Sequence, residues 1–187
     1  MMDKKVTGLI LAGGAGRRVK GKDKGWLVYK GLSLVEHQIN WLKPQVDQII
    51  ISANRNIADY QKLGYPVLED ELTGFHGPLQ GIVGGLALAE GLLWVQPVDM
   101  PELPVDIIKQ AMQVMNNDVL CAYLATKQRN HYLSMLMDSA CLDRLKTFVR
   151  QGNARVSDFH RLVSSQIIQL NIAETYFKNL NDLLDYR

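Results

Sequence analysis

Short apolar runs alternate with amphipathic segments over the first two thirds of the chain. Runs with the continuous apolar character of buried strands cover residues 5–12, 47–54, 65–70 and 92–99. Segments in which apolar residues recur at helical spacing lie at residues 33–45, 57–64, 78–91 and 104–116. The first helix has a capping-box signal, because Glu36 follows Ser33 by three residues. This alternation predicts a mostly parallel sheet with helices on both faces.

The last third of the chain is less regular. Residues 118–124, 131–138 and 165–170 have the pattern of strands, and residues 141–152 have that of a helix. Neither an internal repeat nor a linker-like stretch interrupts the sequence. We therefore expect residues 1–187 to form a single α/β domain, a three-layer Rossmann-like fold with a mostly parallel, doubly wound central sheet.

Composition and charge fit an ordinary globular protein of 187 residues. A net charge of +2 is too small to indicate a nucleic-acid ligand, and no stretch approaches the roughly 18 apolar residues of a membrane span. The opening segment matches a signal peptide poorly, because its short apolar run contains Gly8 and leads into Arg17 and Arg18. Cys121 and Cys141 lie too far apart for a metal-binding pair. We expect two reduced, packed thiols in a cytoplasmic protein.

Glycines and polar residues follow the predicted strands of the first half. The strand ends carry Gly13 and Gly14, Asn54, Glu69 and Asp70, and Asp99. In an open α/β sheet ligands bind outside the carboxyl ends of the strands, so we expect these groups on one rim. A dense set of cations follows the glycines, namely Arg17, Arg18, Lys20, Lys22 and Lys24. A glycine turn whose backbone N–H groups can approach a ligand, followed by cations, indicates a site for a nucleotide polyphosphate.

Two common phosphate-binding motifs do not fit this loop. Residues 16–22, GRRVKGK, have the spacing of a Walker A loop as far as its lysine. Asp23 then stands where that motif needs a serine or threonine hydroxyl for magnesium, which excludes a P-loop kinase. The dinucleotide fingerprint also fails, because Val19 occupies the place of its third glycine after Gly14 and Gly16.

Several segments match a known family in order along the chain. They are LILAGGAGRRVKGKDKGWL (9–27), SANR (52–55), LED (68–70), GPLQG (77–81), VDMP (98–101), QGNARVSDF (151–159) and FKNLND (177–182). Together they resemble the molybdenum cofactor guanylyltransferases, the MobA family of nucleotidyltransferases. The resemblance implies one nucleotidyltransferase domain over residues 1–187, with a nucleotide-binding half at about 1–110 and an acceptor-binding half at about 111–187.

The resemblance also implies a reaction and a set of site residues. GMP would pass from GTP to the terminal phosphate of molybdopterin, with release of pyrophosphate and with Mg²⁺ as cofactor. The family's nucleotide-binding residues map onto Leu11, Ala12, Gly13, Gly14, Lys24, Asn54, Asp70 and Asp99. Lys24 and Arg18 would offset charge on the leaving pyrophosphate, and Asp99 would bind the metal, which makes these three the expected catalytic residues. Acceptor contacts are implied for Arg155, Asn179 and Asn181.

For its partners we expect GTP and molybdopterin as substrates, and transient contact with molybdopterin-handling or molybdoenzyme-delivery proteins. Neither a nucleic acid nor a membrane is expected, and the chain should be a monomer. The attacking group is a phosphate monoester whose second pKa is about 6, so it is largely a dianion at neutral pH and needs no general base.

Departures from the family pattern leave alternatives open. Val19 and Lys20 follow Arg18 where the family has Met-Gly, and the acceptor-side His-Pro-Leu becomes HYL at residues 131–133. A molybdopterin cytidylyltransferase, a sugar-phosphate nucleotidyltransferase and a GTP-binding paralogue without activity are the alternatives. Single residues have structural alternatives too: a helix N-cap for Asp99, and a surface position for Arg155.

Overall fold

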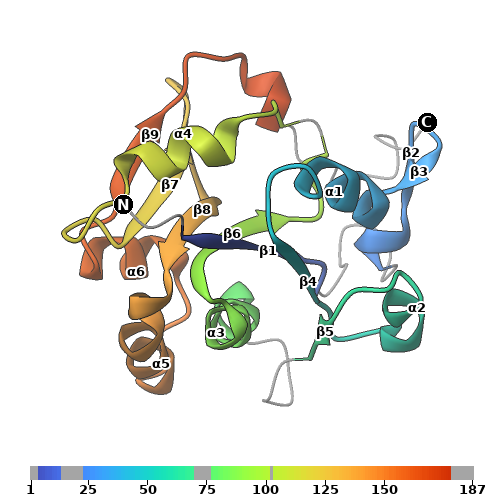
Figure 1. Cartoon of the computed structure of the whole chain (residues 1–187), viewed down its shortest axis with the longest axis horizontal. Helices are drawn as coiled ribbons and strands as arrows, with labels where there is room; N and C mark the ends of the chain where they lie inside the picture. Colours follow the sequence, from blue (N-terminus) through green and yellow to red (C-terminus); the bar gives the residue numbers. More distant parts are fainter. Residues whose placement is uncertain (1–3, 14–22, 70–76, 102, 178–187) are drawn as a thin grey trace.

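A seven-stranded sheet forms the centre of the molecule, and helices cover both of its faces (Figure 1). The computed structural model describes residues 4–13, 23–69, 77–101 and 103–177. In these ranges the strands of the sheet are β1 (Lys5–Leu11), β4 (Gln48–Ser52), β5 (Val67–Leu68), β6 (Gly91–Pro97), β7 (Cys121–Ala125), β8 (Asn130–Asp138) and β9 (Gln166–Gln169). The α-helices are α1 (Leu34–Leu42), α2 (Ile57–Gln61), α3 (Pro78–Leu88), α4 (Ile107–Val114), α5 (Leu142–Arg150) and α6 (Val156–Leu162).

The strand order is β5-β4-β1-β6-β8-β7-β9. Strands β5, β4, β1 and β6 are parallel, β8 is antiparallel to both of its neighbours, and β9 is parallel to β7. The chain order reverses beside β1, because β4 and β5 extend the sheet to one side and β6 to the other. Leu11 pairs with Ser52 on one side and Pro97 on the other, so three strands end at the same level. A crevice outside the ends of β1 and β6 is where such a sheet binds ligands.

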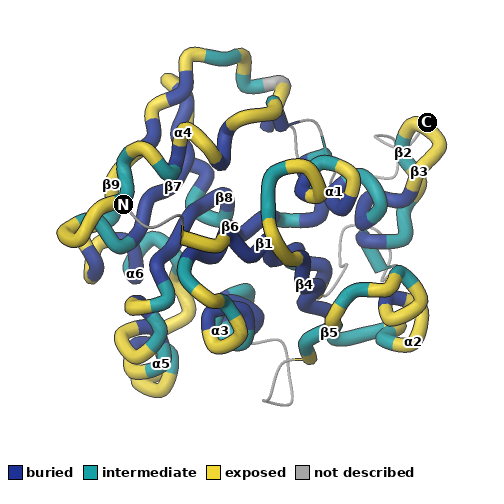
Figure 2. The backbone as a smooth tube through the Cα atoms, in the orientation of Figure 1, coloured by how far each residue is buried: buried dark blue, intermediate teal, exposed yellow. Residues whose placement is uncertain are grey.

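Two hydrophobic cores lie on the two faces of the sheet. Consecutive strand residues point to opposite faces, so Ile10 joins the core that contains side chains of α1, α2 and α4. Its neighbour Leu9 joins the core that contains side chains of α3, α5 and α6. In Figure 1 α1 and α4 lie above the sheet, whereas α3 and α5 lie below it. Figure 2 shows the central strands buried for most of their length, which explains their continuous apolar sequences.

Most of the elements expected from the hydrophobic pattern are confirmed, and so is the mostly parallel, doubly wound sheet. The capping box is present at the start of α1, where the Ser33 hydroxyl accepts from the Glu36 N–H and the Glu36 carboxylate accepts from the Ser33 N–H. Asp99 does not cap a helix, because α4 begins at Ile107 and its N-cap is Asp106. The helix-cap alternative for Asp99 is therefore wrong.

The elements that the pattern did not predict are short. The hairpin of β2 (Val28–Tyr29) and β3 (Leu32–Ser33) has only two residues in each strand, too few to show alternation. Lys30 and Gly31 both have positive φ at its turn, as a tight two-residue hairpin requires. Helix α6 has seven residues, and its first four overlap the family motif at residues 151–159.

Small residues bring α3 close to the sheet. Gly77 is the N-cap of α3 with φ of 81°, and Pro78 occupies its first turn. A Cβ atom on Gly81 would lie 2.3 Å from the Ser52 hydroxyl and 3.1 Å from the Ser52 Cβ, so a side chain there would push the helix away from β4. These glycines let a helix begin against the sheet.

The second half of the chain contains two buried thiols and a buried histidine. Cys121 and Cys141 are free and fully buried, as expected, and burial raises their thiol pKa values to about 12 and about 11. Nε2 of His160 lies 2.9 Å from the carbonyl oxygen of Tyr132, and Nδ1 lies 2.8 Å from the Ser165 hydroxyl. Because a carbonyl only accepts, Nε2 carries the proton and Nδ1 accepts. Burial lowers the pKa of His160, although its bond to Tyr132 opposes this.

We expect the free energy of unfolding to decrease as the pH falls below about 6.5, the ordinary histidine pKa. Above that pH His160 is neutral in both states. Below it the unfolded chain binds a proton that the buried imidazole does not, which costs up to about 1.4 kcal/mol per pH unit for this site. Urea denaturation at about pH 7.5 and about pH 5.5 measures the loss. His160→Gln should show a smaller loss, and an equal loss in both proteins would contradict the assignment.

Among the described residues, none of the helices has the length and apolar character that crossing a membrane requires.

Candidate active site

The end of β1 is bonded to both neighbouring strands before the chain turns away. The N–H groups of Ala12 and Gly13 donate to the Ser52 carbonyl at 2.9 and 3.0 Å, and the Val98 N–H donates to the Leu11 carbonyl at 3.1 Å. A Cβ atom on Gly13 would lie 3.2 Å from the Asn54 side-chain nitrogen, so the turn passes directly beside Asn54. The N–H groups of Ala12 and Gly13 therefore donate to an acceptor within the sheet. The backbone groups that can accept hydrogen bonds from the donors of a nucleotide base are carbonyl oxygens.

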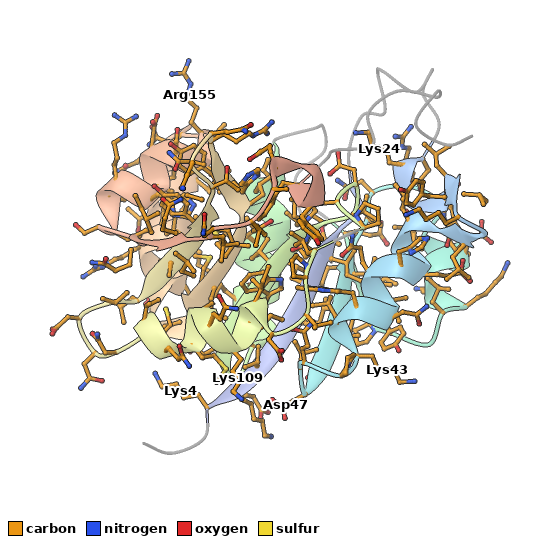
Figure 3. The ribbon with its side chains drawn as sticks, turned by 90° about the horizontal axis from the view of Figure 1, so that it is seen from above. Lys4, Lys24, Lys43, Asp47, Lys109 and Arg155 are labelled. Carbon is orange, nitrogen blue, oxygen red and sulfur yellow. The ribbon has the colours of Figure 1, made fainter. Side chains whose placement is uncertain are left out.

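An ion pair joins the loop after β1 to the end of β6. Lys24 begins the short helix η2 (Lys24–Trp26), and its Nζ lies 2.9 Å from Oδ2 of Asp99, which is 75 residues further along the chain. The side chains are 22% and 16% exposed, so both keep some contact with solvent. Figure 3 shows Lys24 at the side of the molecule where β1 ends, opposite Lys4. The pair places one cation and one carboxylate at the switch point of the sheet.

Helix α1 fixes the backbone on both sides of Asp99. The side-chain amide of Gln38, which is 1% exposed, donates to the Met100 carbonyl at 2.8 Å and lies 3.5 Å from the Val98 carbonyl. Trp41, one turn further on, donates to the Pro104 carbonyl at 3.2 Å. Helix α1 thus holds the turn that carries Asp99 in place. Sequence reasoning missed Gln38, although an amide among the apolar positions of a predicted helix is a usable signal.

The turn that carries Lys24 is held from a different helix. Asp23 is the N-cap of η2 and accepts from the Gly25 N–H at 3.1 Å. The same carboxylate accepts from the Tyr60 hydroxyl at 2.8 Å and from the side-chain amide of Asn56 at 3.0 Å. Sequence reasoning had used Asp23 only to exclude a Walker A loop. An aspartate directly before Lys-Gly is also an N-cap signal, which could have revealed this role.

The metal expected at Asp99 fits the residues present. Among the described residues, no three histidine, cysteine, aspartate or glutamate side chains are grouped so that they could hold a metal ion. Mg²⁺ does not need such a cage, because it is commonly bound by one or two carboxylates together with substrate phosphates and water. Asp99, partly exposed at a strand end beside a cation suited to phosphate, has the chemistry of such a carboxylate.

The candidate acceptor residues lie in the other half of the chain. Arg155 is exposed at the N-cap of α6, and in Figure 3 it points outward on the same side of the molecule as Lys24. The His131 ring stacks on Phe177 with centroids 3.7 Å apart, and its Nε2 lies 3.1 Å from Oε1 of Glu174. Burial lowers the pKa of His131, against the opposing effect of the Glu174 carboxylate. These contacts attach the chain to the sheet just before the expected acceptor residue Asn179.

The structure brings six of the expected nucleotide-site residues to the ends of three adjacent strands. They are Leu11, Ala12, Gly13, Lys24, Asn54 and Asp99. Arg155 is on the same side but belongs to α6. Gly14, Arg18, Asp70, Asn179 and Asn181, which complete the expected set, lie outside the described residues.

Comparison with known proteins decides the family. The model of the MobA-like NTP transferase domain matches residues 8–166. The molybdenum cofactor guanylyltransferase of Haemophilus influenzae (strain ATCC 51907) is 35% identical over 184 residues, covering 97% of this chain and 96% of the relative. The chain belongs to the molybdenum cofactor guanylyltransferase family. The family's enzyme from Yersinia pestis (strain Pestoides F) is 36% identical over 186 residues, covering 98% of this chain and 94% of that one.

Solved structures show how widely the fold of this family is shared. The molybdopterin-guanine dinucleotide biosynthesis protein A of Archaeoglobus fulgidus superposes with a TM-score of 0.76 at 19% identity, covering 96% of this chain and 94% of that one. The 2-C-methyl-D-erythritol 4-phosphate cytidylyltransferase of Thermus thermophilus superposes with a TM-score of 0.66 at 12% identity, covering 91% and 90%. Since proteins named for different nucleotides share the fold, the fold alone does not select the base.

Proposed function

We propose that the protein transfers GMP from GTP to the terminal phosphate of molybdopterin and releases pyrophosphate. The observation that carries this proposal is the Lys24–Asp99 pair at the ends of β1 and β6, in a chain of this family. A triphosphate placed there would meet a cation and a metal-binding carboxylate together. The names of the two relatives favour guanine over cytosine.

The transfer is a displacement at the α-phosphorus of GTP. An oxygen of the acceptor phosphate forms the new bond to that phosphorus, and the bond to the bridging oxygen of the β-phosphate breaks. The leaving pyrophosphate takes the electron pair of the broken bond. Because the acceptor phosphate is largely a dianion at neutral pH, no side chain has to remove a proton from it.

The residues of the site contribute alignment and charge neutralisation. Lys24, together with Arg18, would offset the negative charge that develops on pyrophosphate, while Asn54 and Asp70 would hold the base and ribose. Asp99 would hold Mg²⁺, which would neutralise phosphate charge. The Asp99 carboxylate is paired with Lys24 in the structure. We propose that Lys24 exchanges this carboxylate for phosphate oxygens when the nucleotide enters.

The two halves of the sheet suit the two substrates. We propose that residues 1 to about 110 bind GTP and that residues from about 111 onward bind molybdopterin. Support comes from the ion pair between Lys24, which begins η2, and Asp99, which follows β6, and from Arg155 on the same side of the molecule in the other half of the chain. We also propose a cytoplasmic location, which the two free, buried thiols favour.

The test is pyrophosphate release from GTP in the presence of molybdopterin and Mg²⁺, with CTP, ATP and UTP as controls. We expect release that requires both GTP and the acceptor. Release with CTP in preference to GTP would identify a cytidylyltransferase instead. Tight GTP binding without release would identify a paralogue that has lost catalysis, and would overturn the proposal.

A further inference from the structure

The turn that presents Lys24 is organised around one carboxylate. Asp23 precedes Lys24, and Gly25 follows it, so both neighbours of Lys24 in the chain belong to the hydrogen-bonded unit. Oδ1 of Asp23 accepts from the Gly25 N–H and from the Tyr60 hydroxyl, while Oδ2 accepts from Asn56. The carboxylate therefore closes the turn and also ties it to α2, more than thirty residues away in sequence.

Tyr60 is part of the hydrophobic core, so its position is fixed by packing. Its side chain is fully buried, and its ring packs against Trp26, the last residue of η2, with centroids 5.0 Å apart. Burial raises the pKa of the Tyr60 phenol, and the charge of Asp23 raises it further. The hydroxyl therefore keeps its proton at neutral pH and donates it in the hydrogen bond to Asp23.

Gly25 shows how closely the turn is seated on Tyr60. A Cβ atom at this position would lie 2.0 Å from the Tyr60 hydroxyl oxygen and 3.0 Å from the ring carbon that bears it. The backbone of the turn therefore rests directly on the phenol, which leaves no space for a side chain. The contact of Gly25 with the phenol and the hydrogen bond from the Tyr60 hydroxyl to Asp23 together set the position of the Lys24 backbone.

From these contacts we infer that Tyr60 is a positioning residue for Lys24 and acts through Asp23. The ring and hydroxyl hold the Asp23–Gly25 turn so that the Lys24 ammonium reaches the triphosphate beside Asp99. This inference rests on the proposed function and deepens it, because Tyr60 itself does not touch the substrate. Such a site accelerates the reaction by aligning charged groups, so a small displacement of the turn should lower the rate of turnover.

The test is a double-mutant cycle between Tyr60→Phe and Lys24→Ala. Tyr60→Phe removes one oxygen and keeps the ring against Trp26, so the protein should fold. We expect turnover with saturating acceptor to fall about tenfold, and Mg²⁺·GTP binding measured by calorimetry to weaken several-fold. In the Lys24→Ala background the same change should have almost no further effect on either quantity, because the group that Tyr60 positions is absent. Tyr123→Phe, which removes a hydroxyl from a buried side chain of β7, is the matched control.

An equal loss from Tyr60→Phe in both backgrounds would overturn the inference, since a general structural role would act with or without Lys24. So would unchanged turnover and binding in the single variant. If Tyr60→Phe is too unstable to measure, Gly25→Ala takes its place in the cycle, because its methyl group would meet the buried phenol and push the Asp23–Gly25 turn away from Tyr60. If the wild-type protein binds Mg²⁺·GTP without releasing pyrophosphate, the proposed function fails, and the binding cycle still decides the role of Tyr60.

Discussion

Lys24→Ala is expected to fold normally and to lose turnover by a factor of about 10²–10³. Lys24 supplies a preorganised positive charge beside the expected metal ligand Asp99, with its Nζ 2.9 Å from Oδ2 of Asp99. The charge that it offsets appears mainly as the pyrophosphate leaves, so kcat should fall more than the affinity for GTP. Both side chains of the pair retain solvent contact, so loss of the pair should lower stability by only about 1 kcal/mol.

The measurements are steady-state pyrophosphate release and urea denaturation of the same preparations. Lys109→Ala is the matched control, because Lys109 is an exposed lysine of α4 on the opposite side of the molecule in Figure 3. Lys24→Arg would test whether charge alone suffices, since the guanidinium keeps the charge but changes its geometry. Unchanged turnover in Lys24→Ala would remove the residue from the mechanism.

The general position of the site could be predicted because it follows from topology. Buried parallel strands need continuous apolar sequences, and the residues that follow them must then lie on one rim. The sequence alone therefore places Gly13, Asn54 and Asp99 at the same edge of the sheet. The contact of Lys24 with Asp99 could not be derived in this way. It depends on where η2 lies relative to the end of β6, which no periodicity in the sequence records.

The residues that hold Lys24 and Asp99 in place were harder to predict, because their roles also depend on tertiary contacts. Tyr60 and Gln38 sit on helices whose apolar spacing indicates only that one face is buried. Whether a buried polar atom on that face bonds to Asp23 or to the Met100 carbonyl depends on tertiary contacts. Asp23 was conspicuous as an exception to the Walker A pattern, and its role as a cap has a local signal, but its bonds to Tyr60 and Asn56 depend on the position of α2. The sequence thus indicated the candidate site residues better than the residues that hold them in place.

Asp99→Asn is expected to separate metal binding from nucleotide binding. The amide cannot replace the carboxylate as a strong Mg²⁺ ligand, so turnover should fall by a factor of about 10²–10³. GTP affinity without Mg²⁺ should stay the same or increase, because the substitution removes a negative charge from the triphosphate site and releases Lys24 from its ion pair. Calorimetric titration of GTP with and without Mg²⁺ measures both effects, with Asp118→Asn, an exposed aspartate far along the chain, as the control. If Mg²⁺ strengthens GTP binding equally in Asp99→Asn and in the wild type, the metal is held elsewhere and the role given to Asp99 is wrong.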